Sequence, residues 1–343
     1  MGLSIIDIAK EAGVSKSTVS RVLNGGSVSE KSRQAVSLAI RKLEYSPNFM
    51  ARTLRGVNSK IIGILSCGGQ IFQNQLLASH YAGIMDVFQK NGYDILLVHD
   101  DYNYQYGHLE PKIITYLKEK RIAGLMTVGS DDLPIIREAA KSFRNVVYDG
   151  PRIYQDRGFR VSLDNYKFSK EAYSYLNESD CGNVLTVISF DHNALTLERR
   201  IQAYCDVKKI SKEEAETSFL VLNCSPLFDL SKACEEVYGA FSTGNYSSIL
   251  VDDINLARQI VSYFSAHGKS FYEDYSIVAF ERAQKHFVSQ ENEITTLLLP
   301  IYHYGTALAS LMIEVIENPL LKIKDVEIPY KLCKRKSVRN LKK

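Results

Sequence analysis

The sequence predicts a small all-α domain of the helix-turn-helix kind, followed by an α/β body with parallel sheets. The first prediction depends on three short helical patterns in the first sixty residues, with a glycine between the first two. The second depends on apolar strands that alternate with helical patterns after residue 60, because such alternation is typical of parallel sheets. The length of 343 residues allows more than one domain.

Composition excludes several classes of protein. No apolar run approaches the roughly 18 residues of a membrane span. The amino terminus has no basic segment followed by an apolar stretch, so we expect no secretory signal. The six cysteines are scattered and form no C-x-x-C pair, which indicates reduced thiols of a cytoplasmic protein.

The net charge of +3 is distributed unevenly along the chain. Residues 1–60 carry ten Lys and Arg against four Asp and Glu, a net charge of +6, whereas the remainder carries 32 against 35, a net charge of −3. A basic module on a mildly acidic body indicates a polyanionic partner for the module alone.

A single turn separates the first two helical patterns. Ser4 and Asp7 form a predicted capping box for the first helix, and Gly13 ends it. Ser15 caps the second helix, and Ser29 caps a third. The inward positions of the first two helices and their turn are apolar: Ile5, Ile8, Ala9, Ala12, Val14, Val19, Val22 and Leu23.

The outward face of the second helix is rich in hydroxyl groups and cations. It presents Lys16, Ser17, Ser20 and Arg21. Short hydroxyl side chains allow close approach to phosphates and base edges, and lysine and arginine donate to guanine O6 and N7. We therefore predict that this helix enters the major groove of DNA. The alternative is a solvated face on an ordinary helix pair.

Residues 4–24, SIIDIAKEAGVSKSTVSRVLN, resemble the headpiece of the LacI/GalR family of bacterial transcription regulators. Residues 28–56, VSEKSRQAVSLAIRKLEYSPNFMARTLRG, continue the resemblance through the third helix and the hinge. The resemblance implies DNA contacts from the headpiece and hinge, at Ser4, Ile5, Ser15, Lys16, Ser17, Ser20, Arg21, Asn48, Ala51, Leu54 and Arg55.

The hinge also has a physical interpretation. Pro47 and Asn48 can begin a helix that Gly56 ends, and the few residues between them are too short for a stable isolated helix. We expect this helix to form only on DNA, although a plain linker is the alternative. In the family, two such helices pair in the minor groove and a leucine from each wedges between bases; Leu54 is at the matching position.

The body resembles the two-lobed core of the same family more weakly, and that core is similar to periplasmic sugar-binding proteins. The fragments VSLDN (161–165) and ITTLLLPIYHYG (294–305) match the passages between lobes. We expect crossings near 161–165, 288–294 and 321–326. The resemblance implies that an effector binds between the lobes at Phe72, Asp149, Thr196, Arg200, Asp252 and Glu281.

The body departs from the family pattern in two places. Residues 66–75, SCGGQIFQNQ, replace the Asp-x-x-Asn-Pro-Phe-Phe pattern that usually follows the first strand. Glu281 stands where aspartate is usual. The class of effector therefore cannot be copied from a relative.

Catalytic and metal motifs are missing from the sequence. Residues 63–70, GILSCGGQ, have the spacing of a phosphate loop, but Gly69 and Gln70 stand where lysine and Ser/Thr are required. Neither G-x-S-x-G nor H-E-x-x-H occurs, and the seven histidines are dispersed. We expect no catalytic residues, no metal site and no cofactor.

Together with these patterns, the family resemblance implies a repressor of a carbohydrate-utilisation operon. We expect a homodimer on near-palindromic operator DNA, in the bacterial cytoplasm at the nucleoid. The expected effector is a sugar or sugar phosphate, with galactosides favoured, because a second pocket cation for a phosphate is not evident. Inducer and co-repressor both remain open. The alternative is a sugar-binding or sugar-processing body whose amino-terminal module only localises it.

The predicted domains follow from the same patterns. They are a headpiece at 1–46, a hinge at 47–58, a two-lobed core at 59–338 and a disordered basic tail at 339–343.

Overall fold

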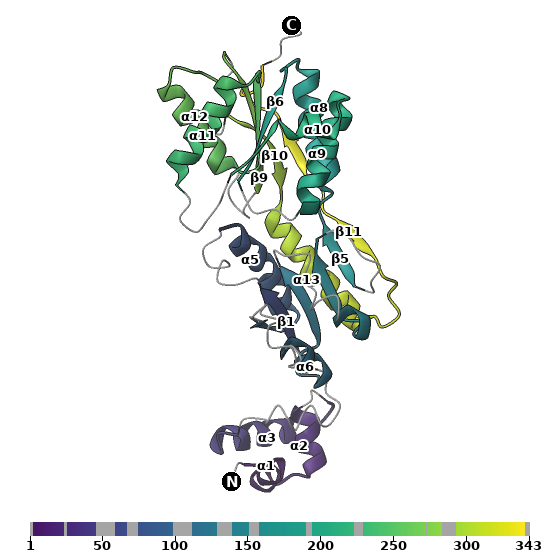
Figure 1. Cartoon of the computed structure of the whole chain (residues 1–343). Coiled ribbons are helices and arrows are strands. Elements are labelled where there is room, and N and C mark those ends of the chain that lie inside the picture. Colours follow the sequence, from purple (N-terminus) through teal and green to yellow (C-terminus); the bar gives the residue numbers. More distant parts are fainter. Residues whose placement is uncertain are drawn as a thin grey trace. The chain divides into compact units, whose positions relative to one another are not determined.

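The chain divides into two compact units, residues 1–59 and 60–343 (Figure 1). The computed structural model describes residues 3–23, 26–45, 59–66, 75–98, 112–128, 139–150, 158–189, 194–222, 229–271, 273–282 and 293–339. The predicted hinge therefore lies outside the described residues, and so do the predicted contacts Asn48, Ala51, Leu54, Arg55 and Phe72. The division into headpiece and hinge stays a prediction.

The first unit consists of three helices, α1 (Ile5–Ala12), α2 (Lys16–Leu23) and α3 (Glu30–Lys42). The predicted capping box is present, because the carboxylate of Asp7 accepts hydrogen bonds from the Ser4 N–H at 2.8 Å and from its hydroxyl at 2.6 Å. Gly13 ends α1 with a left-handed φ of 62°, a conformation that favours glycine.

A small apolar core holds these helices together. Ile8, Val19 and Val36 are fully buried, one from each helix. Lys42 Nζ also lies 2.6 Å from Glu11 Oε1, but this ion pair is exposed and adds little stability. The helix-turn-helix prediction is confirmed.

The first lobe of the second unit is built on a six-stranded sheet. Its strands are β1 (Ile61–Ser66), β2 (Asp94–Val98), β3 (Gly124–Val128), β4 (Val146–Asp149), β5 (Phe159–Ser162) and β11 (Asp325–Glu327). They are arranged β11-β5-β4-β3-β1-β2, and every neighbouring pair is parallel. Two helices, α5 (Gln75–Lys90) and α13 (Ile301–Glu317), pack on one face, and α6 (Lys112–Lys118) packs on the other.

The second lobe has its own six-stranded sheet. Its strands are β6 (Val184–Ile188), β7 (Phe219–Val221), β8 (Ser248–Val251), β9 (Ser276–Arg282), β10 (Thr295–Leu299) and β12 (Lys331–Cys333). The order is β12-β10-β9-β8-β6-β7, and only β12 is antiparallel to its neighbour. The predicted parallel sheets in two lobes are confirmed.

Helices cover both faces of the second sheet. The pair α11 (Leu230–Thr243) and α12 (Ile254–Ala266) packs on one face, and α8 (Asn165–Glu178) and α9 (Ala194–Lys208) pack on the other, with the short α10 (Lys212–Glu216) beside α9 (Figure 1). No described helix is long and apolar enough to cross a membrane.

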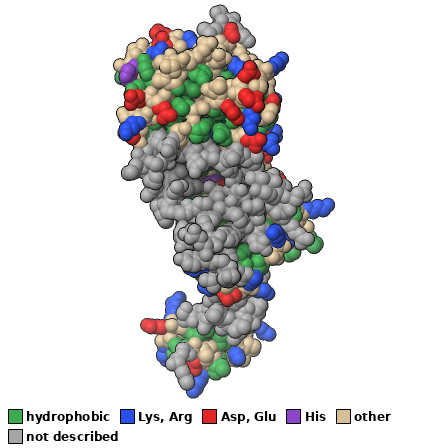
Figure 2. Space-filling view, in the orientation of Figure 1, with side chains coloured by type: hydrophobic (Ala, Val, Ile, Leu, Met, Phe, Trp, Pro, Cys, Tyr) green, Lys and Arg blue, Asp and Glu red, His purple; other side chains and the backbone are tan. Residues whose placement is uncertain are grey.

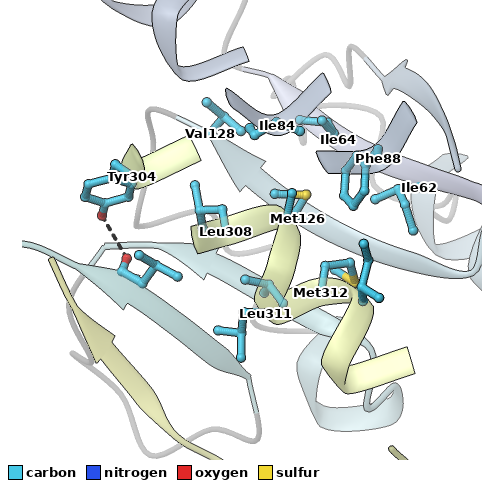
Figure 3. Close-up of a cluster of buried hydrophobic side chains, with 14 of the residues drawn as sticks. Ile62, Ile64, Ile84, Phe88, Met126, Val128, Tyr304, Leu308, Leu311 and Met312 are labelled. Carbon is cyan, nitrogen blue, oxygen red and sulfur yellow. Dashed lines mark hydrogen bonds between the residues drawn. The ribbon is translucent and has the colours of Figure 1, made fainter. Parts of the chain in front are cut away.

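Two glycines bring α5 and α13 together in the first lobe. A Cβ at Gly83 would lie 2.1 Å from the carbonyl oxygen of Tyr302, and one at Gly305 would lie 2.1 Å from that of His80. Only glycine permits such an approach of two backbones. The core beneath them includes Ile84, Phe88, Leu308 and Met312 (Figure 3).

The chain passes between the lobes three times. The first passage lies between β5 and α8, within the expected range of 161–165. The expected second passage at 288–294 is wrong, because β9 and β10 pair in the same sheet and the chain leaves that sheet at Pro300, before α13. The expected third passage at 321–326 is also wrong, because β11 pairs with β5 and the passage follows at 328–330.

The start of the predicted basic tail is ordered. The Arg339 N–H donates to Ser276 Oγ at 3.1 Å, and its Nη1 donates to the carbonyl oxygen of Glu273 at 2.7 Å. These bonds fix Arg339 to the second lobe. The expectation of disorder is therefore wrong for Arg339, and residues 340–343 lie outside the described residues.

Candidate functional site

The outer face of α2 carries the predicted base-reading side chains. Lys16, Ser17 and Arg21 are exposed, whereas Val19 on the opposite side of the helix is fully buried. Ser20 is half-buried. Figure 2 shows Lys and Arg side chains on the visible face of the first unit. This arrangement leaves two cations and a hydroxyl free of the core, at the spacing of one helix face.

Three other predicted DNA contacts have structural roles in the headpiece. Ser4 caps α1 through Asp7. The hydroxyl of Ser15 accepts from the Thr18 N–H at 3.1 Å, and therefore caps α2. Ile5 is half-buried and packs against the core. Their caps and packing set the orientation of α2, and any contact with DNA stays a prediction.

Sequence reasoning missed two exposed apolar side chains near the start of the headpiece. Ile6 is 61% exposed and Leu3 is 48% exposed. The signal was present in the helical period, because Ile6 lies outside the stripe formed by Ile5, Ile8 and Ala9. An exposed isoleucine on α1 offers methyl groups of the kind that make apolar contact with thymine.

The predicted pair Arg200 and Asp252 comes together in the second lobe. Arg200 Nη1 lies 3.7 Å from Asp252 Oδ2, and the two side chains are only 4% and 1% exposed. Arg200 comes from α9, and Asp252 directly follows β8 at its carboxyl end. Burial lowers the pKa of Arg200, whereas the Asp252 carboxylate acts in the opposite direction.

Two residues that the sequence prediction missed complete this cluster. Ser189 directly follows β6, and its N–H and hydroxyl donate to Asp252 Oδ1 at 2.9 and 2.5 Å. Arg282 ends β9, and its Nη1 donates to the carbonyl oxygen of Asp252 at 3.4 Å. The same atom is 3.9 Å from Asp253 Oδ2. The rule that ligand groups follow strand ends could have found Ser189.

The Arg282 side chain corrects one expectation from the sequence. We expected no second cation beside Arg200, but Arg282 is largely buried and its charge contributes to lowering the pKa of Arg200. Both cations have carboxylate partners, Asp252 and Asp253, so the cluster has no net charge.

The structure separates Glu281 from this cluster. Its Oε2 accepts from Thr296 Oγ1 at 2.7 Å and lies 3.5 Å from Arg335 Nη2. Successive side chains of a strand point to opposite faces, and the neighbouring Phe280 ring lies 5.0 Å from the Arg200 guanidinium. The contacts of Glu281 therefore join β9 to β10 and to the segment after β12.

In the first lobe, the predicted contact Asp149 has a partner that the sequence did not indicate. Asp149 ends β4, and its Oδ2 lies 4.0 Å from Nδ1 of His80 on α5. Burial lowers the pKa of His80, and the Asp149 carboxylate opposes this shift. No sequence pattern pointed to His80, because it lies in a helix with neither a strand end nor a motif beside it.

The predicted contact Thr196 lies on α9, one helical turn before Arg200, and is half-buried.

The Arg200 cluster can hold a polar ligand. Among the described residues, Nε and Nη1 of Arg200 have no hydrogen-bond partner. Buried N–H groups normally have acceptors, so these two predict an acceptor from a ligand. Carboxylates accept hydrogen bonds from hydroxyl groups, and a guanidinium donates hydrogen bonds to two oxygens. This combination suits polyols and their derivatives.

Comparison with protein families gives two successive matches along the chain. The family model described as "Bacterial regulatory proteins, lacI family" matches residues 4–48. The model described as "Periplasmic binding proteins and sugar binding domain of LacI family" matches residues 77–336.

Individual proteins match over almost the whole chain. The ribose operon repressor of Halalkalibacterium halodurans is 28% identical over 342 residues, which cover 98% of this chain and 97% of the relative. The sucrose operon repressor of Pediococcus pentosaceus is 26% identical over 337 residues, 96% and 97% of the two chains. A crystal structure of the lac repressor dimer bound to operator and the anti-inducer ONPF has a TM-score of 0.75 at 18% identity, over 99% and 100% of the chains.

Proposed function

This chain belongs to the LacI family of bacterial regulatory proteins, and we propose that it represses a carbohydrate-utilisation operon under the control of a sugar bound by the second unit. Two polar features described above support the proposal, one for each half. One is the exposed basic face of α2, and the other is the buried Arg200 with N–H groups that lack an acceptor.

The face of α2 supports sequence-specific DNA binding. Lys16 and Arg21 are exposed, and within the described part of the chain neither forms an ion pair that would have to break on binding. Arginine recognises guanine through O6 and N7, whereas the lysine and Ser17 reach bases or phosphates. One helix reads only a few base pairs, so a two-fold dimer on a near-palindromic operator is proposed.

Exposed apolar side chains on the edge strands support a dimer of the second unit. Leu96 and Leu97 are exposed on the edge strand β2, and Met85 is exposed on α5. Val221 is exposed on β7, the edge strand of the other sheet. An uncovered apolar edge strand invites pairing with other chains, and a second copy of this chain would cover both edges.

The effector controls DNA binding only if it binds two arrangements of the lobes with different affinity. Residues 163–164, 300 and 328–330 connect the lobes, so a ligand that contacts both lobes acts through these short passages. We propose that the resulting movement sets the spacing of the two hinges in the dimer. Both an inducer and a co-repressor can use this route.

The regulator is favoured over the sugar-processing alternative, because the relatives named above are transcription regulators. The proposed place of action is the bacterial cytoplasm, on the chromosome.

Selection of binding sites from random duplex DNA by the full-length protein tests this proposal. We expect near-palindromic sites, and we expect Arg21→Ala to relax the preference at one base pair of each half-site. Arg41→Ala removes the same charge from an exposed position on α3 and serves as the control. Enrichment of no sequence would contradict the proposal.

The ligand half of the proposal needs a separate measurement. Thermal stability of the full-length protein is measured with ribose, sucrose, lactose, glucose and glucose 6-phosphate, and each stabilising compound is then added to the operator complex. We expect a stabilising compound to change operator affinity. Arg200→Lys keeps the charge beside Asp252 but loses the planar pair of donors, so it should lose the stabilisation. A variant that binds as tightly as wild type would remove Arg200 from the site.

A further inference from the structure

The first lobe holds a buried histidine whose ring is incompletely bonded. His80 lies on α5 and is only 6% exposed. Among the described residues, no group forms a hydrogen bond with its Nε2 atom. Buried polar atoms in proteins nearly always have a partner, so an exception calls for a functional explanation.

The neighbours of His80 fix its position at the carboxyl edge of the first sheet. Asp149 ends β4, and the 4.0 Å between its Oδ2 and His80 Nδ1 exceeds the length of a hydrogen bond. The Tyr304 ring meets the imidazole edge-on, with centroids 4.7 Å apart and planes at 88°. Both Tyr304 and Asp149 therefore border the imidazole.

Two passages between the lobes lie next to this site. Tyr304 is in the first turn of α13, which follows the second passage. Its hydroxyl donates to the carbonyl oxygen of Val161 at 2.8 Å, in the strand before the first passage (Figure 3). His80 therefore lies where the first lobe meets the chain segments that lead to Arg200 and Asp252.

The backbone around His80 packs closely against α13. A Cβ on Gly305 would clash with the carbonyl oxygen of His80, so α5 and α13 are in direct backbone contact there. A second such contact joins Gly83 to Tyr302, one helical turn along α5. A side chain on a helix that packs this closely against its neighbour is well placed to be preorganised for a ligand, which lowers the entropy lost on binding.

We propose that His80 is a specificity-determining residue of the effector site and that its Nε2 accepts a hydrogen bond from a hydroxyl group of a neutral sugar. The inference rests on the proposed function and adds a contact in the first lobe. A neutral imidazole carries one proton, and in the proposed tautomer this proton is on Nδ1, the nitrogen nearer the Asp149 carboxylate, so that Nε2 carries the lone pair. Asp149 accepts from a neighbouring hydroxyl of the same sugar.

The charges at this end of the site select against anionic ligands. The imidazole is neutral at pH 7 because burial lowers the pKa of His80, and Asp149 carries a negative charge. A phosphate group brings only acceptors and more negative charge, and it finds no donor in this pair. Hydroxyl groups donate to both. The pair therefore favours a neutral sugar over its phosphate.

Calorimetric titration of the full-length protein tests the inference, with ribose, sucrose, lactose and glucose as probes and glucose 6-phosphate as the anionic comparison. We expect a neutral sugar to bind more tightly than the phosphate. His80→Leu should weaken the tightest neutral sugar at least about tenfold, because a sugar hydroxyl then stays unpaired. His80→Gln keeps an acceptor and should bind within about threefold of wild type. The control His303→Leu changes an exposed histidine and should bind like wild type.

Deoxy analogues of the tightest sugar separate a direct contact from a general loss of packing. The analogue that lacks the contacting hydroxyl should bind wild type more weakly, but should bind His80→Leu as well as the parent sugar does. If His80→Leu does not fold, the same comparison is made with His80→Phe and His80→Gln, of which only the glutamine variant should discriminate the analogue.

Three results would overturn the inference. The first is an unchanged affinity of His80→Leu for the tightest neutral sugar. The second is an equal effect of His80→Leu on the affinity for every deoxy analogue. The third is a preference for glucose 6-phosphate over all neutral sugars. If Arg200→Lys abolishes binding while His80→Leu does not, the proposed function stands and only the role of His80 fails. Absence of binding by every probe would contradict the proposed sugar control and the inference together.

Discussion

The two units of the chain place their functional side chains in opposite environments. In the first unit, Lys16, Ser17 and Arg21 lie on the exposed face of one short helix. In the second, Arg200, Asp252 and His80 are buried and come from separate helices and strand ends. A surface function can therefore be altered with little effect on folding, whereas changes to the buried site act on stability and binding together. Four predictions test this contrast.

Arg200→Ala should have the largest effect, in the second unit. It leaves the carboxylate of Asp252 buried without its ionic partner, which costs about 3–5 kcal/mol of folding stability. Because Ser189 and Arg282 still contact Asp252, we expect a loss near the lower end of that range. Chemical denaturation measures the loss, with Arg199→Ala, an exposed neighbour, as the control. Equal stability of the two variants would mean that the buried site residues do not contribute to folding stability.

Val19→Ala should destabilise the first unit by about 2–3 kcal/mol, because it removes two buried carbons from a core of only three helices. Proteolysis and thermal unfolding should show the headpiece opening first. The matched control Val187→Ala removes the same atoms from the second sheet, where Val187 is also fully buried. One common transition in both variants would contradict independent folding of the two units.

Arg21→Ala should cost about 1–3 kcal/mol of operator affinity. Because the side chain is exposed, folding stability should stay within about 0.5 kcal/mol of wild type. Fluorescence anisotropy on the selected operator and on a site with one altered base pair separates base reading from phosphate contact. Equal weakening on both sites would assign Arg21 to the phosphate backbone.

The smallest effect concerns acid stability of the first unit. The hydrogen bonds from the Ser4 hydroxyl and N–H lower the pKa of Asp7 below its ordinary value of 3.8. A lowered pKa means that the carboxylate stabilises the headpiece above about pH 4 and that this contribution is lost as the pH falls through the lowered value. Circular dichroism between pH 2 and 6, sampled at roughly half-unit steps, should show this loss, and Asp7→Asn should lack it. An unaltered acid transition in Asp7→Asn would remove the capping box from the explanation.

The sequence predicted most of the first unit because its determinants are local. The caps at Ser4, Ser15 and Ser29 and the turn at Gly13 lie within a few residues of the helices they limit. The exposed side chains of α2 followed from helical periodicity alone. The exposed Ile6 and Leu3 were missed, because the outward faces of the helices were interpreted from their polar residues alone.

The second unit was predicted less completely because its pairings are distant in sequence. The sheets and lobes followed from alternation, but two of three passages were misplaced, since periodicity does not tell which sheet β10 or β11 joins. Arg200 and Asp252 were placed by resemblance. Arg282 and His80 were missed because their roles depend on a neighbouring strand and helix that only the folded chain brings near.

The backbone contact between α5 and α13 has a consequence for building hybrid proteins. The first lobe is assembled from two stretches of chain, one that ends with β5 and one that begins at Pro300, and Gly83 and Gly305 fit these stretches to each other. A chimera that takes the first lobe from one relative and the second lobe from another must therefore exchange both stretches together. A single cut after β5 would combine a helix with a foreign neighbour, and any side chain in place of either glycine would keep the two helices apart.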